Sequence, residues 1–227
     1  RDGAAVHLAL EGGFDIEAPR SWGFTGEGRL ERMSYRGVPL EAARSRLSLS
    51  PAELDFSDAT IVFDYQDYPL REAFGGVASG TAKVGRIRYD ARDRSVEVEG
   101  VEGRIWPAPL VRLFAPKVAD SLEGYRFHQP PELSGAGLVD VTPSGRTDLE
   151  VGFRSTSAVG YQLLGADVTL SRPSGRVLIR GSRVDVEDLR LAAFGGSVQA
   201  RFSHRDPRHL SAELSWTDLA AAELGHD

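Results

Sequence analysis

Residues 176–216 decide the fold, and they read RVLIRGSRVDVEDLRLAAFGGSVQARFSHRDPRHLSAELSW. Apolar residues take every second position in short runs, as at 184–186 and 189–191. Successive side chains of a strand point to opposite faces, so this period of two predicts strands with one apolar and one polar face. Gly195-Gly196 and the segment 204–207 separate the runs and are typical of turns. The stretch therefore predicts a meander of short antiparallel strands.

The same alternation continues through most of the chain. Separate strands are expected, for example, at Leu54–Phe56 and at Ala59–Tyr65. The segment 106–124 differs, because its apolar residues recur at spacings of three and four, which suits a helix that Pro116 would kink. A short C-terminal helix is expected after Thr217. The predicted fold class is mainly β: a long curled antiparallel meander sheet with one kinked helical segment near 107–124 and that short C-terminal helix.

An internal repeat divides the chain. The segment LREAFGG at 70–76 matches RLAAFGG at 190–196, and the two phenylalanines lie 120 residues apart. Each copy precedes a strand of small residues, which favours a repeated supersecondary unit. We expect one β-groove segment with two repeat-like halves, about 21–104 and 125–227, joined by the helical segment 105–124. Because the sequence starts at Arg1 without a methionine, we also expect it to be a piece of a longer protein.

The apolar face needs a cover. A helix is about 10 Å wide and strands lie about 4.8 Å apart, so one helix covers only two or three strands. Three covers are available: a facing sheet, closure into a barrel, or an apolar ligand. A facing sheet would give a structural or adhesive all-β module with a dry core. The monotonous meander favours instead a long sheet that we expect to continue beyond both ends of this sequence.

Composition excludes several functions. The 227 residues include no cysteine, so disulfides and thiolate metal sites are absent. The net charge of −6 argues against nucleic acid as a partner. No run of about 18 apolar residues could span a membrane as a helix.

The residues that could carry chemistry are sparse. His204 and His209 flank a turn, which favours a surface turn over a metal pair. Glu97 and Glu99 point the same way on one strand and do not face each other across a cleft. Four aspartates are dense but lack the glycine and final glutamate of a calcium loop: Asp55, Asp58, Asp64 and Asp67. We therefore expect no enzyme activity, no metal and no cofactor.

A family resemblance rests on short motifs near the C-terminus. Asp188–Leu191, Phe194–Gly196, the small-residue strand 197–202 and the run Leu210–Leu219 resemble the AsmA-like family, envelope proteins of Gram-negative bacteria related to TamB. The resemblance implies a repeating β-groove along which phospholipid or another acyl lipid moves between the two membranes. It also implies a periplasmic location, neighbouring repeats of the same protein, and an inner-membrane anchor in a segment outside this sequence.

Candidate groove residues follow from the alternation and from this resemblance. They are the apolar residues of the expected strands: Ile61, Phe63, Val96, Val98, Val139, Val141, Leu149, Val151, Phe153, Val168, Leu170, Val177, Ile179, Val184, Val186, Leu189, Leu191, Val198, Phe202, Leu214 and Trp216. The same side chains could also pack on one another in a dry core, and the sequence leaves both readings open.

Overall fold

The structure is a computed structural model. It describes the following residues: 4–18, 21–66, 68, 79–114, 119–120, 124–140, 147–163, 166–181, 183–193, 196–206 and 209–217.

Strands dominate the described residues. They are β1 (Ala5–Gly13), β2 (Gly23–Tyr35), β3 (Val38–Leu49), β4 (Glu53–Asp64), β5 (Ser79–Asp90), β6 (Ser95–Arg104), β7 (Tyr125–Phe127), β8 (Glu132–Asp140), β9 (Asp148–Arg154), β10 (Val159–Leu163), β11 (Ala166–Arg180), β12 (Arg183–Ala193), β13 (Gly196–Asp206) and β14 (His209–Thr217). Helix α1 (Pro107–Phe114) follows β6, and Ala119 and Asp120 are also helical.

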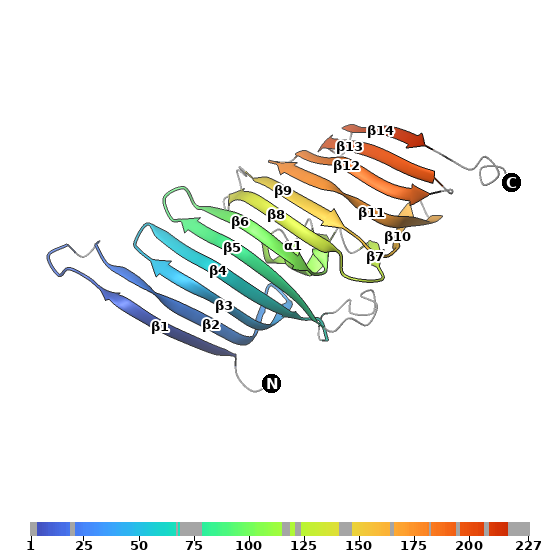
Figure 1. Ribbon diagram of the computed structural model, residues 1–227. Coiled ribbons are helices and arrows are strands. Elements are labelled where there is room, and N and C mark those ends of the chain that lie inside the picture. Colours follow the sequence, from blue (N-terminus) through green and yellow to red (C-terminus); the bar gives the residue numbers. More distant parts are fainter. Residues whose placement is uncertain are drawn as a thin grey trace.

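The strands form a single antiparallel meander (Figure 1). The order along the sheet is β1-β2-β3-β4-β5-β6-β8-β9-β11-β12-β13-β14, with β10 paired to β11 and β7 paired to β10 off this path. β1 and β14 stand at opposite ends, so the sheet is open. The sheet is also continuous from β6 to β8, on either side of α1.

Each path strand has an apolar and a polar side, and the spacing of apolar residues locally changes from two to three. The four-residue patterns 30–33, 56–59, 98–101 and 186–189 read apolar, polar, polar, apolar. The third residue of each has a positive φ: Arg32 at 49°, Asp58 at 51°, Gly100 at 62° and Asp188 at 52°. Such an extra residue is a β-bulge, and it returns the next apolar side chain to the original face.

These bulges join segments that alternation alone separates. The sequence predicted two strands at Leu54–Phe56 and Ala59–Tyr65, but β4 is one strand with its bulge at Asp58. That prediction was wrong because the bulge places two polar residues in a row, and this looks in the sequence like the end of one alternating run and the start of another. The kink at Pro116 and the C-terminal helix after Thr217 lie outside the described residues.

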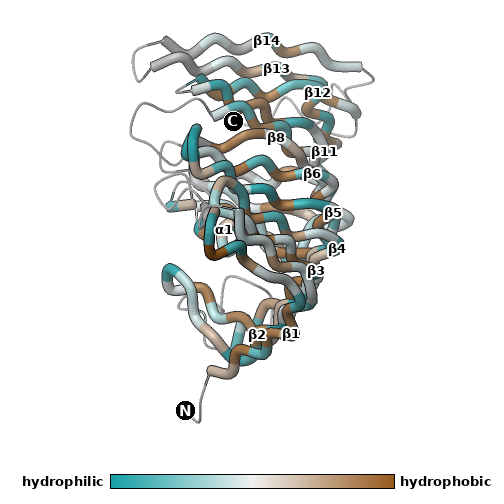
Figure 2. Tube along the Cα trace, turned by 90° about the vertical axis from the view of Figure 1, so that its left-hand side faces the viewer, coloured by the Kyte–Doolittle hydropathy of each residue, from teal (hydrophilic) through white to brown (hydrophobic). Residues whose placement is uncertain are grey.

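Helix α1 lies on the apolar side of the sheet (Figures 1 and 2). Pro107 begins it, as proline favours a first helical turn. The Arg36 guanidinium donates a hydrogen bond to the Leu113 carbonyl oxygen at 3.1 Å, which satisfies a carbonyl of the last turn. The helix is therefore attached to the β2–β3 turn at its C-terminal end. Its presence confirms the first part of the helical segment predicted near 107–124.

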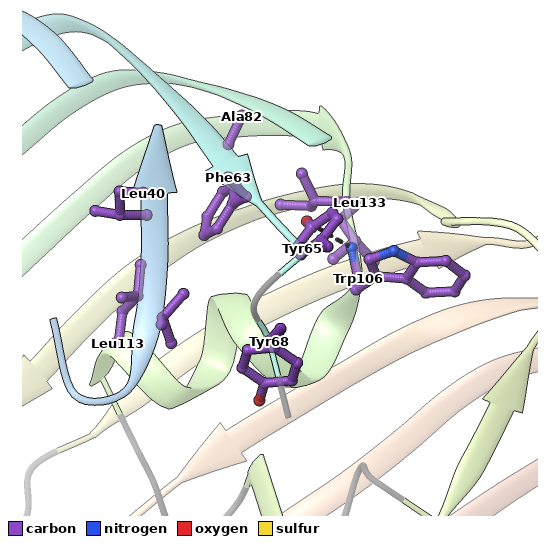
Figure 3. Packing of buried hydrophobic residues seen from close by; sticks show 10 residues of the cluster. Leu40, Phe63, Tyr65, Tyr68, Ala82, Trp106, Leu113 and Leu133 are labelled. Carbon is purple, nitrogen blue, oxygen red and sulfur yellow. Dashed lines mark hydrogen bonds between the residues drawn. The ribbon is translucent and has the colours of Figure 1, made fainter. Parts of the chain in front are cut away.

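A buried cluster forms beneath α1 (Figure 3). Leu113 of the helix faces Leu40, and Trp106 and Tyr65 lie side by side with their rings 6.4 Å apart. The Trp106 backbone N–H donates a hydrogen bond to the Tyr65 hydroxyl oxygen at 3.3 Å. Phe63, Trp106 and Ile105 are fully buried. This cluster is the largest core in the described residues.

Candidate ligand-binding face

Strand register defines one continuous apolar face. Residues directly opposite each other in an antiparallel pair share a face, so a row of partners can be followed across the sheet. One such row crosses from β1 to β12 through the following partners: Leu10, Gly26, Leu47, Phe56, Ile87, Val98, Gly137, Leu149, Ile179 and Val184. The row is apolar or glycine at every step. We call this side of the sheet the apolar face and the opposite side the polar face.

The structure brings most of the predicted groove residues together. All of them except Val141, Val168 and Leu170 lie on the apolar face of the main path. Val141 is outside the described residues, and so is the side chain of Val168. Leu170 and Val168 lie in the part of β11 that pairs with β10, opposite Val159 and Tyr161. The alternation therefore identified a shared surface, whatever occupies it.

Part of the apolar face is covered by protein. One buried cluster combines α1 with side chains of β3, β4, β5 and β8, and a second, smaller one combines Ala59, Val84 and Val98. Phe63 and Val98, both predicted groove residues, are 0% and 5% exposed. We call strands β3–β6 and β8 the covered region. Phe63 and Val98 are therefore buried among other side chains, whereas the predicted groove residues Ile61, Val96 and Val139 are half-buried.

The rest of the apolar face has no such cover among the described residues. No described side chain of β11–β14 belongs to either buried cluster. Ala200 is the only one of their described apolar-face side chains that is buried, while Val177, Val186 and Phe202 are half-buried. Leu214 and Trp216 on β14 are 54% and 63% exposed. We call β11–β14 the uncovered region. Its strands lie at the end of the sheet away from α1 (Figure 1).

Sequence reasoning missed several residues of this face. Leu30, Leu47, Phe56, Val84 and Val101 share it through their strand partners. Their alternation is visible in the sequence. A bulge, however, changes whether odd or even residues lie on the apolar face, so the sequence does not show which alternating runs share that face. Glycines on the face gave no signal at all, since an isolated glycine looks like a turn residue: Gly26, Gly28, Gly103, Gly135, Gly137 and Gly175.

The polar face carries crossed ion pairs. Arg86 bonds Asp55 on the neighbouring strand, and Arg88 bonds Glu97. Arg176 of β11 reaches Asp188 at 2.7 Å and Glu150 at 3.4 Å. The Arg176 guanidinium lowers the pKa of the Asp188 carboxyl below its usual value by hydrogen bonding and by its charge. This face is therefore a solvated, charged surface.

Two of the aspartates that the sequence groups together take part in ion pairs, while Asp67 and the side chains of His204 and His209 lie outside the described residues. Asp55 is held by Arg86 and Asp58 by Arg46, so both serve ion pairs of the polar face. Among the residues that the structure describes, no three histidine or acidic side chains come together as a metal site would require. Within the same residues, no helix has the length and apolarity needed to cross a bilayer.

Comparisons with protein-family models, with curated proteins and with solved structures find no match to this chain. The resemblance to AsmA-like proteins therefore stays a prediction from its sequence motifs.

Proposed function

We propose that the chain binds acyl lipid on its apolar face and has no enzymatic activity. The observation that carries the proposal is the uncovered region, where one side of a continuous sheet is apolar and lacks a protein layer in the described residues. Exposed apolar area of this extent is typical of an interaction surface. Backbone hydrogen bonds are satisfied between neighbouring strands, so the ligand needs to supply only apolar contacts.

The energetics suit an acyl chain. Burying a methylene group contributes about 0.8 kcal/mol, so sixteen carbons contribute roughly 12 kcal/mol before the cost of immobilising the chain. A surface of valine, leucine and phenylalanine provides this burial without any specific polar partner. Binding of this kind holds a lipid without chemical change.

The bulges support a trough. A bulge bends its strand and increases the local twist, and register shifts mark bulges in β4, β6 and β12. Repeated bends of this kind curl a sheet, and the apolar face then becomes the floor of a groove with an open side. A headgroup stays in water at that open side while its acyl chain lies along the floor.

The setting follows from the sequence resemblance. We place the chain in the periplasm of a Gram-negative cell envelope, as a lipid-transfer segment acting with neighbouring repeats of the same protein. The unpaired edges of β1 and β14 fit this arrangement, because each can accept a further antiparallel strand.

Charge insertion tests the proposal. Val186→Asp places a carboxylate in the uncovered region, and we expect it to fold and to lose co-purifying lipid in native mass spectrometry. Gln199→Asp adds the same charge to the polar face of β13, next to Arg190, and is the matched control. Equal lipid content in Val186→Asp and the unchanged chain would refute lipid binding on this face.

A second candidate is a structural all-β module. The buried cluster at α1 favours it for the covered region, because Phe63, Tyr65 and Trp106 pack there without a ligand. The lipid experiment separates the two. A chain that carries no lipid, and takes none up from phosphatidylglycerol vesicles, is a structural module throughout.

A further inference from the structure

A second surface stands out on the polar face, away from the proposed lipid site. One row of strand partners crosses β6, β8, β9, β11 and β12, and it reads Arg104, Glu132, Arg154, Ser174 and Arg190. The row holds three arginines and one glutamate. It therefore carries a formal excess of positive charge on a face where most cations are paired.

Two arginines of this row form no ion pair in the described residues, although the charge of Arg190 helps to lower the pKa of the Asp188 carboxyl. Glu132 lies between Arg104 and Arg154, and its carboxylate bonds Arg104 at 3.3 Å. Asp188, near Arg190, bonds Arg176 at 2.7 Å. Within the part of the chain that the structure describes, neither Arg154 nor Arg190 forms an ion pair. Both side chains are exposed.

The two arginines flank a serine over a hollow. Arg154 and Arg190 are the direct partners of Ser174 on its two sides, on β9 and β12. A depression of about 700 Å³ opens here, and its lining includes both arginines with the small residues Ser134, Gly152 and Ser174. Arg176 and the acidic residues Glu102, Glu132 and Asp188 line the same depression. A Cβ at Gly152 would come within 2.6 Å of the Ser134 hydroxyl oxygen, so a larger residue there would require the Ser134 side chain to turn away.

We propose that Arg154, Ser174 and Arg190 bind a tetrahedral oxyanion, such as a phosphoryl or sulfo group. A guanidinium offers parallel N–H donors that match two oxygens of such a group, and a hydroxyl between two guanidinium groups offers a third kind of donor. The small residues leave space for the anion above the strands. This site lies on the face opposite the apolar one, so it is independent of the lipid proposal.

Titration calorimetry of the full chain with inorganic phosphate tests the site. We expect saturable binding of one phosphate, weakened about tenfold or more by Arg154→Gln or Arg190→Gln, since each removes a charge-assisted hydrogen bond. Ser174→Ala is expected to weaken it a few-fold. A parallel titration uses phosphatidylcholine vesicles with and without phosphatidylglycerol. Arginine-dependent binding to the anionic vesicles alone would identify a lipid headgroup as the source of the oxyanion and would support the site.

Arg44→Gln is the matched control. Arg44 and Lys83 flank Thr60 in the same way on β3, β4 and β5, and both are exposed, but neither lines the depression. We expect this variant to bind phosphate as the unchanged chain does. An equal loss in Arg44→Gln and Arg154→Gln would show that only general positive charge is at work and would overturn the site. So would non-saturable binding, or binding that Arg154→Gln and Arg190→Gln leave intact.

Discussion

The covered and uncovered regions share one sequence pattern and differ in how deeply their apolar side chains are buried. Val98 in β6 and Val186 in β12 both alternate with acidic residues, and the register places both on the apolar face. Val98 is 5% exposed inside a cluster, whereas Val186 is half-buried in a strand that joins no cluster. Alternation therefore determines which face a side chain occupies, and the side chains packed around it determine how deeply it is buried there.

The largest expected difference between the regions comes from a pair of phenylalanines. Phe63→Ala removes a fully buried ring from the covered region, and we expect it to lower the free energy of unfolding by about 3–5 kcal/mol. Phe202→Ala, in the uncovered region, should cost roughly a third of that in lipid-free protein, because its ring is only half-buried. Urea unfolding measures both. Equal losses would show that β11–β14 are packed as tightly as β3–β6.

Gly137 tests the junction between the regions, where β8 meets β9. Its φ is 143°, and an added Cβ would lie 2.1 Å from the Asp148 carbonyl oxygen. We expect Gly137→Ala to cost about 2–3 kcal/mol in urea unfolding, because neither backbone can move without breaking the pairing. Gly13→Ala, which meets nothing within 4 Å, is the control and should be close to neutral.

Tyr65 sharpens the comparison through pH. Burial in the covered region raises the pKa of its hydroxyl well above the usual value. An unfolded tyrosine ionises near pH 10, so above this pH the unfolded chain loses a proton that the folded chain keeps. The stability that this group contributes is therefore complete below pH 10 and falls as pH rises further.

Tyr65→Phe should reduce that alkaline loss and cost about 1 kcal/mol at neutral pH, where the hydrogen bond from the Trp106 amide is removed. Thermal unfolding at pH 7 and pH 11 measures both effects. Tyr161→Phe, a substitution at the β7–β10 pair, serves as the comparison. The same alkaline slope in Tyr65→Phe and the unchanged chain would contradict this assignment.

The smallest effect is expected on the polar face of the uncovered region. Arg176 bridges Glu150, Glu187 and Asp188, but the group is exposed and screened by water. Arg176→Gln should barely shift the unfolding midpoint, and the shift should disappear in high salt. A large, salt-independent loss would mean that this network holds β9, β11 and β12 together.

The sequence predicted the strands well because alternation is a local property. It placed Val184 and Val186 on one face with Leu189 and Leu191, and their register confirms this. It could not predict which part of the apolar face is buried, since nothing near residue 63 indicates that Trp106, far along the chain, will join the same cluster. It also missed the glycines of the apolar face, because a glycine's neighbours across the sheet depend on register, which is set by bulges at residues such as Asp58 and Asp188.

The positive-φ residues have one more consequence. Asp58 is an inserted residue in β4. Before it the even-numbered residues lie on the apolar face, and after it the odd-numbered residues do. Deleting that single residue would leave every other side chain unchanged and still move Leu54 and Phe56 from the apolar face to the polar face, so half of the strand would present the wrong residues to each side. Homologous sequences of this kind are therefore best aligned by the pairs of polar residues that mark the bulges, because an alignment error of one residue exchanges the apolar and polar faces.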